Sequence, residues 1–167
     1  MAQRGTIVQV SLSGGGVPKL PVMEAEVGEL GITGDKHDDV SNHGGPERAL
    51  CLFSIERLAA LAAEGHAMAP GNTGENITTE GIDWDDMLPG TRLRLGSDVV
   101  IELTRYTTPC KTIGHTFRDG DFTRMSHLRF PGWSRIYARV LGTGTIRPGD
   151  AIEVVSAIAE VAGDARR

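Results

Sequence analysis

The sequence predicts a mainly β fold, and three observations support this. The chain has 167 residues with 22 glycines and 8 prolines, which implies many tight turns between short elements. Its apolar fraction of 40% and charged fraction of 23% are those of an ordinary globular protein. Short β-prone runs outnumber the one segment with a clear helical period. The length suits one core, so we expect a single domain over residues 1–167.

The charge, apolar runs and cysteines of the chain indicate its class of binding partner and its cellular location. The formal net charge is −5 with acids and bases interspersed, so no long basic stripe is offered to a nucleic acid or an anionic membrane. No apolar run approaches the roughly 20 residues that cross a bilayer, and residues 1–10 lack the apolar core of a secretory signal. Cys51 and Cys110 lie far apart in dissimilar settings, which predicts reduced thiols. We expect a cytoplasmic protein with a small-molecule partner and with neither nucleic acid nor membrane.

Two short β-prone runs, Thr6–Val10 and Pro21–Val27, open the chain. The glycine-rich spacer between them, residues 13–19, can continue neither run and is typical of a flexible loop. It lacks the spacing of a P-loop or of a dinucleotide fingerprint. Lys19, at the end of this loop, is either a cation for an anionic ligand or a solvated lysine.

The segment Gly31–Arg48 is dense in polar side chains between glycines. Rigid scaffolds often present functional groups on such loops. Asp35, His37 and His43 include a carboxylate and two imidazoles, the ligand set of a non-haem iron site. The same side chains can instead hydrogen-bond their own backbone, and the spacing does not decide between the two.

A buried strand and one helix follow. Ala49–Phe53 is a continuous apolar run, typical of a strand buried on both faces, and Cys51 within it is most simply a core residue. After it, apolar side chains recur with a helical period from a helix cap at Ser54 to a stop at Gly65. We therefore predict one clear helix over about residues 54–65.

A second polar loop, residues 70–78, carries Glu75 and Asn76 between turn residues. These side chains can position a ligand or simply satisfy the backbone of the turn. Next, residues 93–95 and 99–103 are apolar runs joined by Gly-Ser-Asp, which predicts a β-hairpin. Its second strand runs toward Cys110.

Cys110 is the most informative residue of the chain. Pro109 fixes the local backbone, while Lys111 and a helical turn that begins at Cys110 would favour the thiolate over the thiol. Thiolates are nucleophiles and soft-metal ligands. The alternative is a small buried hydrophobe at the end of a strand.

The last third of the chain is less patterned. Residues 117–131 carry scattered basic groups without a firm period, which predicts a loop with one helical turn at most. An ordered segment follows, on which Arg135 and Arg139 are either ligand contacts or solvated. A turn and a final strand lie within residues 146–155, and the tail after Gly163 is expected to fray.

In this order the motifs resemble the MOSC domain, which is found at the C-terminus of molybdenum cofactor sulfurases and in small free-standing bacterial proteins. The resemblance spans most of the chain, and the combination is more specific than any one motif. The motifs are Gly34-Asp35-Lys36-His37, His43-Gly44-Gly45-Pro46, Gly74-Glu75-Asn76-Ile77-Thr78, Pro109-Cys110, Tyr137-Ala138-Arg139-Val140 and Pro148-Gly149-Asp150.

The resemblance implies a distorted, mainly β-barrel fold and a molybdenum cofactor (molybdopterin). Cys110 is similar to the cysteine that binds molybdenum in related amidoxime-reducing enzymes, so it becomes the expected metal ligand. The implied activity is reduction of N-hydroxylated bases or amidoximes. An electron-donor protein would supply the electrons for this reaction. Beside Cys110, the expected catalytic residues are Asp35 and His37. The expected cofactor-binding residues are Lys19, His43, Arg48, Glu75 and Asn76.

The chain departs from this pattern in one place. Many molybdenum-binding relatives carry an arginine three residues before the cysteine, where this chain has Thr107. Arg105 lies two residues earlier, which on an extended strand moves the side chain by roughly 7 Å. We therefore do not expect Arg105 to contact a cofactor.

Two other functions fit the same residues. Cys110 can carry a persulfide and transfer sulfur, which needs an exposed thiol but no pterin. Alternatively, the domain is a non-catalytic module that binds an anion or a cofactor, and its affinity would survive Cys110→Ala.

Overall fold

The computed structural model describes residues 3–36 and 44–156. These residues form eleven strands, one α-helix and four short 3-10 helices. In chain order the elements are β1 (Arg4–Leu12), β2 (Leu20–Val22), β3 (Ala25–Gly28), β4 (Gly31–Ile32), η1 (Pro46–Arg48), β5 (Leu50–Ser54), α1 (Ile55–Ala63), β6 (Ile77–Glu80), η2 (Trp84–Asp86), β7 (Arg92–Leu95), β8 (Val99–Tyr106), η3 (Lys111–Thr116), η4 (Phe122–Met125), β9 (Ile136–Gly142), β10 (Gly144–Ile146) and β11 (Ala151–Ser156).

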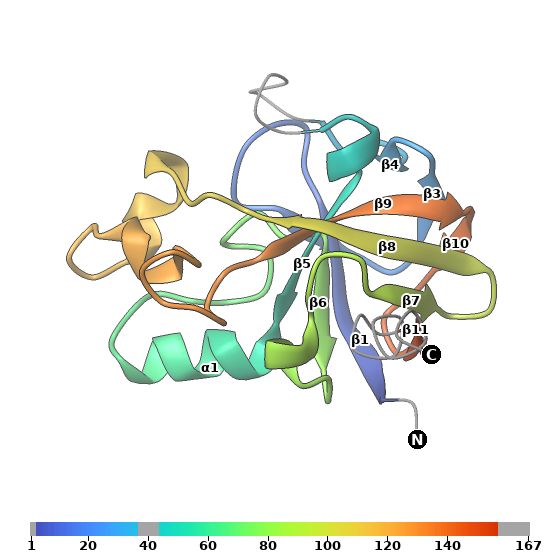
Figure 1. Cartoon of the computed structure of the whole chain (residues 1–167). Helices are drawn as coiled ribbons and strands as arrows, with labels where there is room; N and C mark the ends of the chain where they lie inside the picture. The colour runs from blue at the N-terminus through green and yellow to red at the C-terminus, as the bar shows by residue number, and fades with distance from the viewer. Residues whose placement is uncertain (1–2, 37–43, 157–167) are drawn as a thin grey trace, which may run out of the picture.

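Seven strands close into a barrel. Their order is β11-β7-β8-β9-β5-β6-β1, and β11 also pairs with β1, which completes the ring. All neighbours in the ring are antiparallel except β5 and β6, which are parallel and joined through α1. β2 pairs with β1 outside the ring, and β10, β3 and β4 form a small separate sheet (Figure 1). The mainly β barrel that the sequence and its resemblance predicted is confirmed.

The barrel interior is filled from alternate positions of its strands. On the hairpin of β7 and β8, Leu93, Leu95, Val99, Ile101 and Leu103 are each at most 1% exposed. β5 differs, because all five of its residues are buried, as its continuous apolar run predicted. This strand therefore lies at the centre of the fold.

The predicted helix is confirmed as α1. Ser54 caps it by accepting a hydrogen bond from the backbone N–H of Arg57, and Leu58 and Leu61 are buried. The chain leaves the helix at Gly65, whose φ of +100° lies in the region that favours glycine. No helix in the described part of the chain is long and apolar enough to cross a membrane.

One predicted strand is divided in the structure. The run from Pro21 to Val27 is not a single element: it is split between β2, which pairs with β1, and β3, which pairs with β10. The interruption at residues 23–24 lets the chain pass from the barrel to the small sheet, a change of pairing partner that local β propensity does not encode. The tail after Gly163 lies outside the described residues.

Candidate functional site

A cavity of about 130 Å³ lies at the end of the barrel where β8, β9 and several loops converge. Its wall comes from seven separate stretches of chain, so no single motif defines it. The lining residues are Gly16, Val17, Lys19, Lys36, Arg48, Cys51, Gly74, Asn76, Cys110, Thr112, Ile113, Arg135 and Tyr137. The cavity brings together five sequence-predicted residues, Lys19, Arg48, Asn76, Cys110 and the undecided Arg135.

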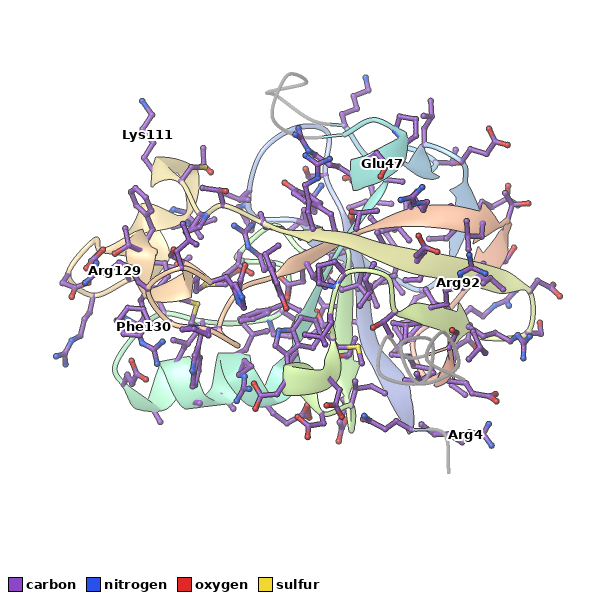
Figure 2. All side chains as sticks on the ribbon, viewed as in Figure 1. Arg4, Glu47, Arg92, Lys111, Arg129 and Phe130 are labelled. Carbon is purple, nitrogen blue, oxygen red and sulfur yellow. The ribbon has the colours of Figure 1, made fainter. Side chains whose placement is uncertain are left out.

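Cys110 lies at the start of η3, four residues beyond the end of β8. Its backbone is extended, with φ −141° and ψ 175°, and its side chain is partly exposed. The thiol Sγ is 2.8 Å from the hydroxyl Oγ1 of Thr112, and either atom can donate. The neighbouring Lys111 is exposed and projects away from the barrel (Figure 2). Cys110 is therefore reachable from solvent and from the cavity, with a hydroxyl as its nearest polar neighbour.

Lys19 also lines the cavity, where it is held by a buried ion pair. Its Nζ donates to both carboxylate oxygens of Asp35, at 2.7 and 2.8 Å, and the two side chains are 7% and 3% exposed. Asp35 also accepts from the side-chain amide of Asn76 at 2.9 Å and from the backbone N–H of Ser13 at 3.0 Å. Asp35 does not line the cavity. It sits behind Lys19, so its contacts orient the lysine rather than reach the cavity.

Asn76 ties this pair to the barrel. Its side-chain oxygen accepts from the backbone N–H of Cys51 at 3.0 Å, and its amide donates to the backbone carbonyl of Ser11 at 3.1 Å as well as to Asp35. With both ends bonded and only 1% exposure, Asn76 has one stable orientation. The loop of residues 70–78 thus fixes one wall of the cavity.

Arg135 is the residue that sequence reasoning left open. It precedes β9 and is only 6% exposed. Its Nη1 donates to the backbone carbonyl of Thr73, while its buried Nε has no hydrogen-bond partner among the described residues. A buried guanidinium N–H without a partner is costly, and an anionic ligand would satisfy it.

The cavity wall is strongly cationic. Lys19, Lys36, Arg48 and Arg135 line it, and within residues 3–36 and 44–156 none of the lining residues is acidic. Asp35 offsets the charge of Lys19 from behind. The arrangement is suited to an anionic ligand. Lys36 lies inside one of the quoted motifs, so the signal for this residue was present in the sequence.

Glu75 does not line the cavity. It is fully buried, and it accepts from the hydroxyls of Thr73 at 2.8 Å and Thr78 at 3.0 Å. Burial raises the pKa of this carboxyl. Because Thr73 supplies the carbonyl that binds Arg135, Glu75 braces the loop that holds the guanidinium.

Cys51 and Tyr137 line the cavity from neighbouring strands, where they are register partners on β5 and β9. The Cys51 sulfur is 3.8 Å from the hydroxyl of Thr107, and burial raises the pKa of this thiol. Burial, and to a smaller extent the nearby Cys51, raise the pKa of Tyr137 to about 12. Both groups are protonated at neutral pH, so this part of the cavity is neutral. The burial predicted for Cys51 is confirmed, and its place on the cavity wall is new.

The remaining residues considered in the sequence analysis do not line the cavity or lie outside the described part of the chain. Arg105 is exposed and does not line the cavity, as expected from its spacing. His37 and His43 lie outside the described residues, so the iron-site hypothesis stays a prediction. Within residues 3–36 and 44–156, no group of three or more metal-ligating side chains is gathered.

Comparison with protein families identifies the chain. The model of the MOSC domain matches residues 39–153. The chain belongs to the MOSC family. It is 28% identical to protein YiiM of Escherichia coli over 138 residues, which is 80% of this chain and 60% of that protein. It is 27% identical to protein YflK of Bacillus subtilis, with coverage of 74% and 55%.

A longer relative also matches this MOSC chain. A protein named reductase from Gibberella moniliformis is 30% identical over 130 residues, which is 75% of this chain but 22% of that protein. The chain thus spans between one half and two thirds of the length of the two bacterial relatives and about a fifth of the fungal one.

Solved structures share the fold of this MOSC domain. YiiM from Geobacillus stearothermophilus matches with a TM-score of 0.73 and 24% identity, covering 91% of this chain and 75% of that chain. YiiM from Escherichia coli matches with a TM-score of 0.70 and 25% identity, covering 92% and 70%. The YUAD protein from Bacillus subtilis matches with a TM-score of 0.71 and 20% identity, covering 92% and 98%.

Proposed function

We propose that this MOSC protein binds a molybdenum cofactor in its cationic cavity, with Cys110 as the thiolate ligand of molybdenum, and reduces N-hydroxylated bases or amidoximes. The observation that carries the proposal is that the Cys110 thiol and four cationic side chains line one cavity. A pterin cofactor of this kind carries sulfur ligands for the metal and a phosphate group. Its binding site therefore needs a side chain that can complete the metal's coordination and cations that can bind the phosphate.

The residues present fit such a group. The unpartnered Nε of Arg135, together with Lys19, Lys36 and Arg48, would hold the cofactor's phosphate. A thiolate from Cys110 is a suitable ligand for a high-valent metal because it donates charge. When bound, the cofactor would supply a two-electron redox centre for reduction of an N–O bond.

The chain's own groups would orient the substrate and exclude competing chemistry. Tyr137 keeps its proton at neutral pH because its pKa is raised to about 12, so it presents a neutral phenol to the cavity. The buried Cys51 also stays a thiol and would not compete with Cys110 for the metal. Lys19 can donate a hydrogen bond to a substrate oxygen while Asp35 fixes its direction.

The test is elemental analysis for molybdenum with fluorescence detection of released pterin, on protein from a cofactor-competent host. Native chain, Cys110→Ser and the matched control Cys51→Ser are compared. Near-stoichiometric molybdenum in the native chain and Cys51→Ser, but not in Cys110→Ser, supports the proposal and justifies assays with N-hydroxylated substrates. Absence of molybdenum and pterin from all three would contradict it.

A second candidate is sulfur transfer through a Cys110 persulfide, favoured by the partial exposure of this thiol at the cavity mouth. A carrier needs no pterin, so persulfide labelling of metal-free protein distinguishes it. Label on native chain but not on Cys110→Ser, without molybdenum in either, would favour this candidate. Ligand affinity unchanged by Cys110→Ala would instead favour a binding-only module.

A further inference from the structure

The charge of the chain is unevenly distributed. Residues 105–135 contain six lysines and arginines but only two aspartates, which gives this basic segment a formal net charge of +4. The whole chain has a formal net charge of −5, so the remainder carries −9. Such an asymmetry orients an approaching acidic partner, because the basic segment attracts it and the acidic remainder of the chain repels it.

The basic segment lies next to the cavity. It begins at the end of β8, contains η3 and η4, and returns to the barrel at β9. In Figure 1 it stands off the barrel as the yellow and orange lobe. It supplies Cys110, Thr112, Ile113 and Arg135 to the cavity wall. A partner that docks on this lobe therefore lies beside the proposed redox site.

Several of its cations face solvent. Arg105, Lys111 and Arg118 are exposed, and no acidic partner is found for them in the described ranges. Arg129, 58% exposed, lies 3.7 Å from Asp121, donates to the Thr123 hydroxyl and covers the Phe130 ring. Lys111 and Arg129 are among the outermost side chains of the lobe in Figure 2. These charges are available to a partner.

The lobe is also firmly built. Arg124 forms a two-pronged ion pair with Glu64, at 2.8 and 3.0 Å, and its guanidinium stacks 4.2 Å from the Trp133 ring and 4.7 Å from the Phe130 ring. Met125 is 1% exposed, whereas Leu128 is 94% exposed. A fixed lobe that combines exposed arginine with an exposed apolar side chain has the composition of an interaction surface.

We propose that this basic segment is the docking surface for an acidic electron-transfer protein carrying a flavin or an iron–sulfur cluster. This inference rests on the proposed reductase function, which needs an external source of electrons. Reduction of one N–O bond consumes two electrons and two protons, converting R–NH–OH to R–NH₂ and water. The docked partner delivers the electrons, and solvent supplies the protons.

Charge complementarity selects this partner. Transient redox complexes are small, and opposite charges around the redox site raise their association rate while salt weakens them. The acidic remainder of the chain repels an acidic donor, so that encounters concentrate on the lobe. A nucleic acid would also be attracted by positive charge, and the experiment tests this outcome.

The test compares two double variants of the cofactor-loaded protein, each of which changes the net charge by the same amount. One is Arg118→Glu with Arg129→Glu on the lobe, because both arginines are exposed and neither lines the cavity. The matched control is Arg4→Glu with Arg94→Glu, which reverses exposed charges on β1 and β7. The rate of benzamidoxime reduction is measured with reduced acidic flavodoxin and, separately, with reduced methyl viologen.

With flavodoxin at low salt, the lobe variant should react at least about tenfold more slowly than native protein and the control less than about threefold. About 0.5 M salt should remove most of this difference. With methyl viologen the lobe variant should match the control. Equal losses in both variants with flavodoxin would overturn the docking proposal, because net charge alone would explain them.

A direct binding measurement distinguishes failure of the docking surface from failure of the proposed reductase function. Chemical-shift changes on addition of oxidised flavodoxin should cluster in residues 105–135 and vanish in the lobe variant. If methyl viologen supports no turnover of native protein but these changes occur, the reductase function fails while the docking surface stands. Absence of such changes, or tighter binding of a single-stranded oligonucleotide to the same lobe, would overturn the docking surface.

Discussion

The two cysteines report on two regions that meet at one cavity. Cys51 belongs to β5 in the barrel wall, where it is 6% exposed and burial raises its pKa. Cys110 belongs to the basic lobe, begins a short 3-10 helix and is partly exposed, with a hydroxyl 2.8 Å from its sulfur. The same functional group is thus packed in one region and presented in the other.

The difference shows how this fold divides its tasks. Strand pairing and apolar packing determine the barrel wall, and the buried side chains of Asn76 and Glu75 in the adjoining loop are bonded internally. The lobe is held in part by Arg124, through its ion pair with Glu64 and its stacking on the Phe130 and Trp133 rings. A packed barrel wall that carries a more exposed functional segment is a common arrangement in binding proteins. The predictions below test whether the two regions differ as much as their contacts indicate.

The largest difference is expected for the same truncation made in both regions. Phe53 is fully buried in β5, with its ring 5.8 Å from that of Trp84, so Phe53→Ala should lower the free energy of unfolding by about 3 to 5 kcal/mol. Phe130→Ala in the lobe removes a stacking partner of Arg124 and should cost about 1 kcal/mol. Urea unfolding measures both values. Equal losses would show that the lobe is as much a part of the core as the barrel wall.

The rate of thiol alkylation should also differ between the two regions. In native protein Cys110 should react with iodoacetamide at least about a hundredfold faster than Cys51, because reaction at the buried thiol requires local opening. Mass spectrometry of the alkylated peptides measures the two rates. Cys110→Ser is the control, since native labelling should then nearly disappear and return in denaturant. Comparable rates would contradict the assignment of Cys51 to a closed wall.

The pH dependence of stability tests the buried carboxyl of the wall. Burial raises the pKa of Glu75 above that of the unfolded chain, so folding favours its protonated form. As pH rises from about 4.5 toward 8, the unfolded state loses this proton first, and the stability contributed by the group decreases. Glu75→Gln lacks this decrease, so its free energy of unfolding relative to native protein should increase across the same range.

Glu80→Gln, which removes an exposed carboxyl at the end of β6, is the matched control for this series. Denaturant midpoints at several pH values provide the comparison. A constant difference between Glu75→Gln and native protein over the whole range would contradict a raised pKa.

The smallest effect is expected at the start of α1. Ser54→Ala removes the side-chain cap that accepts from the backbone N–H of Arg57 and should lower the free energy of unfolding by about 1 kcal/mol. Ser54→Asp retains an acceptor and should restore most of this stability. A loss of several kcal/mol for alanine would mean that burial of Ser54, rather than capping, dominates at this position.

The fold was largely predictable from local patterns and from the family resemblance. The apolar run of β5, the capped period of α1 and the Gly-Ser-Asp hairpin turn each act over a few residues, so the sequence displays them directly. The run that became β2 and β3 was predicted as one strand because only long-range pairing divides it.

The candidate site was predictable in part. Cys110 and Lys19 were singled out from their neighbours in the chain and Arg48 from the family resemblance, and the cavity includes all three. Arg135 was left undecided and Tyr137 was quoted only as part of a family motif, because neither residue has a local signal that tells a buried position from a solvated one. Asp35 and Glu75 were expected to contact ligand, whereas their hydrogen bonds place them behind the cavity wall.

By itself, the sequence determined the residue types that chemistry needs and the short-range elements that carry them, because propensity, capping and turn chemistry depend on adjacent residues. Only the tertiary structure decided that Cys110, Lys19, Arg48 and Arg135 line one cavity, that Cys51 shares it, and that the basic segment borders it. These relations depend on the closure of the barrel between β1 and β11, which brings distant parts of the chain together. Burial, and hence the altered pKa values of Glu75 and Tyr137, arises only when these distant parts of the chain pack together.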